Sequence, residues 1–303
     1  MAACGGAGET PPPAPPTERA GRPRAPAVAA PGPEQPGAAA RVEASARAEP
    51  TPGDASPEVV AQCAEAAAAH LAGPTKASAA VLNTAGFRCY RADRLDDAVA
   101  LFGRALDHDP THALAHYNLA SSLGVLRGRG DICGSDATLR RMMTHLEAAV
   151  RFDPGRRARL AEDPDLTPVR DLPRFRILQG ADPATRRGVV QAVQGATFYA
   201  PAPGAFGHPL HLTLQGAAPH KDLEHGALPA LHQRRSVTDA GGLETAEQVG
   251  GWAVDEQGRV RIDPDGGAPG PEVQSWGLTP TGDLAPLGGG GDRLLGMPDE
   301  CSA

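Results

Sequence analysis

Residues 82–110, LNTAGFRCYRADRLDDAVALFGRALDHDP, decide how the central part of the chain folds. Apolar residues recur at helical spacing on both sides of a short polar turn, which predicts one helix to about Arg91 and another from about Leu95. Gly86 in the first helix lets the two helices approach closely, and Phe102 of the second fills the space between them. The stretch therefore predicts a helical hairpin.

The same stretch resembles one complete tetratricopeptide repeat. The matching positions are Leu82, Gly86, Cys89, Leu95, Ala98, Phe102, Ala105, Leu106 and Pro110. A second, similar repeat starts at Ala113 and has Tyr117, Leu119, Ala120, Leu123, Leu139, Met142, Leu146, Ala149 and Pro154. The two closing prolines lie 44 residues apart, whereas the period of the family is 34. We therefore expect an insertion in the Gly-rich stretch 127–135.

Further helices flank these repeats. Ser56-Pro57 is typical of a helix start, with Ser as the cap and Pro in the first turn. The predicted helices are 57–72, 76–91, 95–107, one from about 111, and one ending near 152. Residues 158–178 resemble the closing segment of bacterial repeats, and their apolar residues can cover the exposed end of a solenoid; these are Leu160, Leu166, Val169, Phe175 and Leu178. The resemblance implies a repeat module over residues 57–180 that binds a protein or peptide partner.

The first 56 residues have the composition of a linker. They contain 12 Pro and 16 Ala but no aromatic residue, Leu or Ile, so burial of apolar surface cannot offset the entropy cost of ordering them. We expect a disordered Pro/Ala-rich linker over residues 1–56.

The first four residues, Met1-Ala2-Ala3-Cys4, resemble the lipobox of bacterial lipoproteins, with Met1 where Leu is usual and no apolar segment before it. The resemblance implies a start assigned too late in the gene and a lipid on Cys4, which would attach the chain to a membrane of the cell envelope. The alternative is a cytoplasmic adaptor without an anchor.

From about residue 189 the helical period gives way to strand-like runs. These are 196–200, 210–214, 252–255, 260–263, 273–278 and 284–287, with hairpins around Gly258 and around the turn 279–283. We expect a small antiparallel β domain over residues 189–287, loops or a covering segment over 216–248, and a disordered tail over 288–303. The predicted class is α+β.

The sequence offers little sign of catalysis. Lys and Arg total 29 against 36 Asp and Glu, which argues against a nucleic-acid partner. There is no phosphate-binding loop, and the acidic pairs Asp96-Asp97 and Glu162-Asp163 are interpreted as solvated helix surface. We predict a non-enzymatic adaptor without cofactor or small-molecule substrate.

Histidines and cysteines leave two alternatives open. Five histidines could supply a transition-metal site in a sensory β domain, but their spacing favours ordinary loop and strand positions; they are His208, His211, His220, His225 and His232. Besides Cys4 the chain has Cys63, Cys89, Cys133 and Cys301. Cys63 and Cys89 lie on neighbouring predicted helices, and either a disulfide or two reduced core thiols fits this placement.

The first helix of each repeat has a face opposite its packing face, and by family resemblance these faces line a concave groove. The predicted partner-binding residues on them are Asn83, Phe87, Tyr90, Arg91, Tyr117, Asn118 and Ser121. We expect the three aromatic side chains to be exposed for a partner peptide, and the amides and Arg91 to bond its backbone or a carboxylate. The alternative is that the first helix or the closing segment folds over the aromatics and leaves no open groove.

Overall fold

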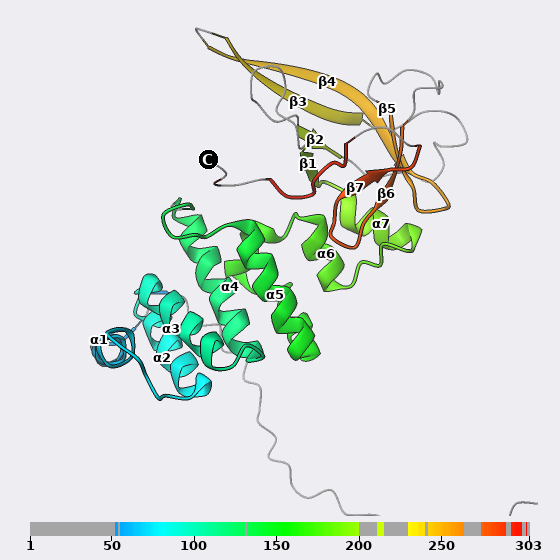
Figure 1. Cartoon of the computed structure of the whole chain (residues 1–303). Helices are drawn as coiled ribbons and strands as arrows, with labels where there is room; N and C mark the ends of the chain where they lie inside the picture. The colour runs from blue at the N-terminus through cyan, green and yellow to red at the C-terminus, as the bar shows by residue number, and fades with distance from the viewer. Residues whose placement is uncertain are drawn as a thin grey trace, which may run out of the picture. The chain divides into compact units, whose positions relative to one another are not determined.

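The chain belongs to the mixed helix-and-sheet class, with the helices before the strands (Figure 1). The computed structural model describes residues 52–53, 55–130, 132–199, 211–214, 230–239, 242–263, 274–288, 292–298 and 301. Cys4 and the predicted linker up to residue 51 lie outside these ranges.

Five helices in the first half of the chain pack in sequence order, each against the next. They are α1 (Pro57–Leu71), α2 (Ala79–Arg91), α3 (Leu95–His108), α4 (Ala113–Gly128) and α5 (Leu139–Phe152). Ser56, Ser78 and Thr138 cap three of them by accepting a backbone N–H three residues on. The five predicted helices are confirmed, and the Gly-rich stretch forms the end of α4 and the turn before α5.

Two glycines permit close packing in this helical region. A Cβ on Gly86 would lie 2.7 Å from the Phe102 ring, so a side chain there would displace the ring. A Cβ on Gly124 would lie 2.0 Å from the backbone oxygen of Asp165, which belongs to the segment after α5. The glycines thus set the spacing between α2 and α3 and between α4 and that segment.

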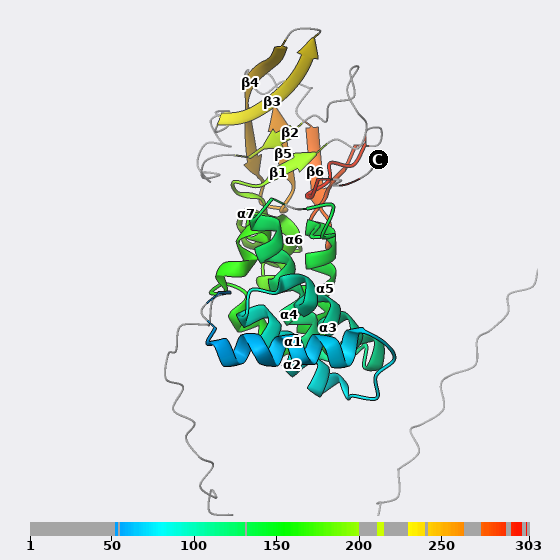
Figure 2. The ribbon, with the colours of Figure 1, turned by 90° about the vertical axis from the view of Figure 1, so that its left-hand side faces the viewer.

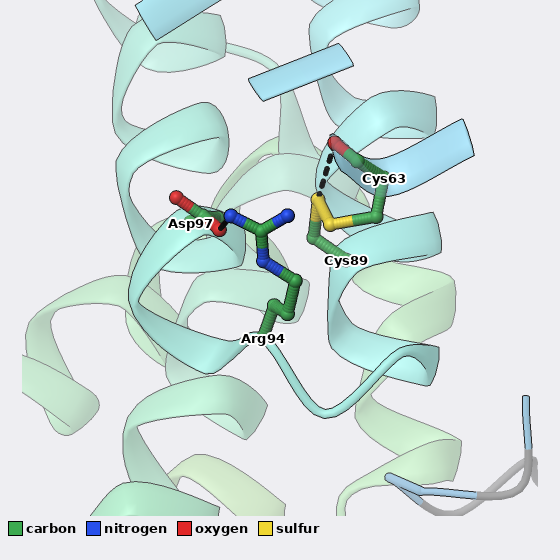
Figure 3. The surroundings of a disulfide bond; sticks show 4 residues. All are labelled: Cys63, Cys89, Arg94 and Asp97. Carbon is green, nitrogen blue, oxygen red and sulfur yellow. Dashed lines mark hydrogen bonds and ion pairs between the residues drawn. A yellow bond between two sulfur atoms is a disulfide. The ribbon is translucent and has the colours of Figure 1, made fainter. Parts of the chain in front are cut away.

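A disulfide joins α1 to α2. Cys63 and Cys89 are both fully buried, and their Cα atoms lie 4.8 Å apart. Figure 3 shows the bond beside the ion pair of Arg94 and Asp97 at the start of α3. Of the two alternatives for these cysteines, the structure therefore has the disulfide.

The segment after α5 closes the helical core. It consists of two 3₁₀ helices, η1 (Pro154–Arg159) and η2 (Pro164–Val169), followed by α6 (Pro173–Gln179) and α7 (Arg186–Val193). Leu160, Leu166, Val169 and Phe175 are buried in the same core as the five long helices, and Leu178 packs against it. The expected burial of these apolar residues against the helices is confirmed.

The strands form one antiparallel meander, whose order in the sheet follows their order in the chain. They are β1 (Thr197–Tyr199), β2 (His211–Thr213), β3 (Ala230–Asp239), β4 (Gly242–Val254), β5 (Val260–Asp263), β6 (Gln274–Leu278) and β7 (Leu284–Pro286). The two predicted hairpins are confirmed: Gly258 and Gly282 take positive φ angles of 76° and 83° in their turns.

The expectation of loops or a covering segment over residues 216–248 is wrong for residues 230–239 and 242–248, which lie in two strands. β3 and β4 pair along ten residues each and form a long hairpin (Figures 1 and 2). The pairing runs through backbone hydrogen bonds, which do not require alternating apolar side chains. Because the sequence here lacks alternation, its pattern did not predict these two strands.

One face of the sheet forms a second core with α7. Its largest members are Trp252 and Trp276, which lie with Val260 and Leu284 on the same face. Arg186 at the start of α7 donates from Nε to the backbone oxygen of Val254, at 3.1 Å. The apolar face of α7 therefore packs against the strands.

The C-terminal segment is bonded to the rest of the chain, where a disordered tail was expected. Leu294 pairs with Leu284 and Leu295 with Tyr199 through backbone hydrogen bonds. Met297 is buried in the helical core, and Cys301 forms a disulfide with Cys133 in the turn between α4 and α5. The tail composition gave no sign of this because two of the anchors, Tyr199 and Cys133, lie far away in sequence.

Candidate functional site

A hollow of about 410 Å³, partly open to solvent, lies between α2, α4 and the start of η2. We call it the α2–α4 hollow. It is lined by Phe87, Tyr90, Tyr117, Asn118, Ser121, Asp163, Pro164 and Asp165. Five of the seven predicted partner-binding residues are therefore brought together at one place.

The other two predicted residues do not line the hollow. Asn83 is buried, and its Oδ1 accepts a hydrogen bond from Asn118 Nδ2 at 3.0 Å, which ties α2 to α4. Arg91 is half-buried, and its backbone oxygen accepts the N–H of Gly53 at 3.2 Å. The side-chain amides of Asn83 and Asn118 thus hydrogen-bond each other.

The expectation of three exposed aromatic side chains is wrong for both tyrosines. Tyr90 is 8% exposed and Tyr117 is 5% exposed. Their hydroxyls donate to carboxylates of the closing segment, Tyr90 to Asp165 Oδ2 and Tyr117 to Asp163 Oδ2 at 2.8 Å. The closing segment therefore folds over these rings. Its carboxylates accept the hydrogen bonds that the buried phenol groups need.

Phe87 remains available at the surface. It is 38% exposed and stacks on Tyr90, with ring centroids 5.9 Å apart and planes 9° from parallel. Single exposed apolar side chains are common on protein surfaces, but this one lines a hollow. The hollow therefore presents one exposed ring backed by a buried one.

Asp163 is the residue that the sequence interpretation missed. It was assigned to solvated helix surface, but it is 7% exposed. Its Oδ1 accepts the backbone N–H of Asp165 at 2.9 Å as the cap of η2, and its Oδ2 accepts the hydroxyls of Tyr117 and Ser121 at 2.8 and 3.1 Å. The signal was present, since Asp before Pro164 is a helix-start pattern.

The electrostatic character of the hollow is acidic. The lining that the structure describes has two carboxylates and no basic side chain. Arg156 lies 5.9 Å from the centre of the Tyr117 ring but forms its ion pair with Asp153, at 3.2 Å. Arg170 donates to the backbone oxygen of Asp163 and not to its carboxylate. Across the described residues, no ion pair reaches the Asp163 carboxylate.

A histidine pair lies elsewhere on α4 and α5. The Nδ1 atoms of His116 and His145 are 2.9 Å apart, and His116 Nε2 donates to the backbone oxygen of Pro110 at 3.0 Å. Burial, with the nearby charges of His116 and Arg141, lowers the pKa of His145 to about 4. His145 is therefore neutral at pH 7 and serves as a packing and hydrogen-bonding residue.

Nothing in the described parts of the chain gathers three or more His, Cys, Asp or Glu side chains as metal ligands. Of the five C-terminal histidines, His208, His220 and His225 lie outside the described residues. The backbones of His211 and His232 lie on adjacent strands, opposite Arg234 and Thr213 respectively.

Among the helices that the structure describes, none combines the length and apolar character needed to cross a bilayer. No protein-family model matches the chain, and neither a curated protein nor a solved structure is found to be similar to it.

Proposed function

We propose that the chain is a non-catalytic adaptor that binds another protein through the α2–α4 hollow. The observation that carries this proposal is the exposed Phe87 ring in a hollow built from the matching faces of two repeat-like helices. Aromatic anchors in preformed hollows supply a large share of the energy at protein interfaces. We further propose that the helical region is a tetratricopeptide-like module whose first helices are α2 and α4.

Hydrogen bonds hold the side chains of the proposed site in place. Tyr90, Tyr117 and Ser121 are all held by hydrogen bonds to carboxylates of the closing segment. A preorganised surface loses less conformational entropy on binding than a mobile one. This supports recognition of one side chain or a short segment by a fixed hollow.

We propose a cell-envelope location, with attachment through a lipid on Cys4. Two disulfides support an oxidising compartment, because thiols of cytosolic proteins are normally kept reduced. The alternative of a cytoplasmic adaptor requires both bonds to persist under reducing conditions.

The proposal is tested by comparing two exposed phenylalanines. Phe87 and Phe152 are 38% and 37% exposed, but only Phe87 lines the hollow. The immobilised full chain is used to capture proteins from an extract of its native cells, and quantitative mass spectrometry compares the variants. We expect Phe87→Ala to lower capture of a specific partner about 30-fold, as for an aromatic hot spot of about 2 kcal/mol.

Phe152→Ala serves as the matched control and should capture the partner at full strength. Melting temperatures of both variants exclude unfolding as the cause. Equal capture by the two variants would remove the hollow as the binding site.

A further inference from the structure

We propose that the disulfide between Cys133 and Cys301 is a redox latch, a bond that holds residues 292–298 when oxidised and releases them when a protein dithiol reduces it. We call residues 292–298 the C-terminal segment. The inference does not depend on the α2–α4 hollow. It rests on the exposure of this disulfide and on the contacts of the segment that precedes Cys301.

The two disulfides differ in their access to solvent. Cys63 and Cys89 are 0% exposed and belong to the helical core, so a reductant cannot reach their sulfur atoms without opening the helices. Cys133 and Cys301 are both exposed. Thiol–disulfide exchange requires a thiolate to reach one of the two sulfur atoms. A reductant that acts on the folded chain therefore opens the exposed bond first.

The opening step is thiol–disulfide exchange with a dithiol of the Cys-x-x-Cys class. One thiolate of the reductant attacks a sulfur of the exposed pair, which forms a mixed disulfide and breaks the bond between Cys133 and Cys301. The second thiolate of the reductant then attacks the reductant's own sulfur in the mixed disulfide. The reductant leaves as an internal disulfide, and the chain gains two electrons and a proton on each cysteine.

The C-terminal segment joins the first and the last strand of the meander. Leu294 both donates a backbone hydrogen bond to Leu284 of β7 and accepts one from it, each at 2.9 Å. Leu295 forms the same pair of bonds with Tyr199 of β1, each at 2.8 Å. Since β1 and β7 lie at opposite ends of the strand order, the segment connects the two edges of the sheet.

The same segment also contacts the helical region. A Cβ on Gly296 would lie 2.1 Å from the backbone oxygen of Gly282 and 3.4 Å from the ring of Pro173 at the start of α6. The N–H of Gly296 donates to Asp283 Oδ1 at 3.1 Å. Met297 is buried in the helical core. Release of the segment therefore removes contacts with the helices as well as with the sheet.

The segment depends on its covalent attachment because it buries little apolar surface of its own. Leu294 and Leu295 are only half-buried, whereas Met297 is buried. Backbone hydrogen bonds near the surface can be exchanged for bonds to water when a segment opens locally. The disulfide restricts the freedom of the open segment, because it fixes the chain at Cys301 as well as at β7. Reduction removes that restriction and favours the open state.

The first experiment measures which bond a dithiol reduces in the folded full chain. Any free thiol, such as that of Cys4, is blocked beforehand, and dithiothreitol is then added without denaturant. Alkylation with mass spectrometry follows each cysteine over time. We expect Cys133 and Cys301 to be alkylated at least about tenfold faster than Cys63 and Cys89. Equal rates, or faster reaction of the buried pair, would overturn the latch.

Hydrogen exchange of the same samples tests the release of the segment. When the exposed bond alone is reduced, the backbone amides of Leu294, Leu295 and Gly296 should exchange at least about tenfold faster, while those of α2 and α4 keep their rates. Reoxidation should restore slow exchange. Unchanged exchange of the segment would show that the bond does not hold it. An equal rise in α2 and α4 would make the bond a stabiliser of the whole fold, and either result would overturn the latch.

Two variants assign the effect to one disulfide. Cys133→Ser combined with Cys301→Ser should exchange like the reduced wild type and no longer respond to dithiothreitol, with circular dichroism confirming that it folds. Cys63→Ala combined with Cys89→Ala keeps the exposed bond and should still show the rise on reduction. A response to dithiothreitol that the serine variant retains, or that the alanine variant loses while folded, would assign control of the segment to the other bond and overturn the proposal.

Discussion

Gly124→Ala is expected to destabilise the protein by about 3 kcal/mol, near the upper end of typical overpacking effects. The added Cβ would lie 2.0 Å from the backbone oxygen of Asp165, and a backbone atom cannot rotate away as a side chain can. The start of η2 must therefore shift or separate from α4. For a folded region of this size the melting temperature should fall by about 6–12 °C.

Gly103→Ala is the matched control for this substitution. Gly103 also lies within a helix, α3, but a Cβ there would meet no heavy atom within 4 Å. Alanine favours the helix over glycine by up to about 1 kcal/mol, so this variant should melt at the same or a higher temperature. A Gly124→Ala protein as stable as Gly103→Ala would show that the closing segment does not pack on α4 as described.

Replacing both Cys63 and Cys89 with alanine is expected to cost about 3–4 kcal/mol of unfolding free energy. The bond closes a loop between residues 26 apart in sequence, and the loop-entropy relation gives this magnitude for a loop of that length. Denaturant unfolding of the full chain measures the change directly.

The second disulfide supplies the comparison. Cys133 and Cys301 are exposed, and replacing both with serine leaves the buried α1–α2 bond in place. Under a strong reductant, the variant with serine at positions 133 and 301 should lose as much unfolding free energy as the Cys63→Ala, Cys89→Ala protein does. Unfolding of this variant that is unaffected by reductant would contradict the bond between Cys63 and Cys89.

The helices were predictable because their signals are local. Gly86 and Phe102 both lie within residues 82–110, and the dipeptide Ser56-Pro57 by itself indicates a helix start. The apolar residues of the closing segment were equally readable, since burial of Leu166 and Phe175 follows from the need to cover the last helix pair.

The parts that could not be predicted depend on contacts between distant residues. Cys133 and Cys301 are separated by 168 positions, and no local pattern pairs them. β3 and β4 pair through their backbones over a stretch without alternation. The burial of Tyr117 likewise required Asp163, which lies 46 residues later in the chain.

The candidate site could likewise be predicted only in part from the sequence. Helical spacing correctly placed Phe87, Tyr90, Tyr117, Asn118 and Ser121 on neighbouring faces of α2 and α4. The sequence did not reveal that Asp163 and Asp165 complete the hollow, because each lies far along the chain from the tyrosine whose hydroxyl it accepts.

The central claim, that the α2–α4 hollow contacts a partner protein, is tested most directly by site-specific photo-crosslinking in native cells. The full chain carries p-benzoylphenylalanine in place of Phe87, or in place of Phe152 as an equally exposed control. We predict one discrete crosslinked protein from position 87 that is absent from position 152; the same adducts from both positions, or none from position 87, would contradict the account.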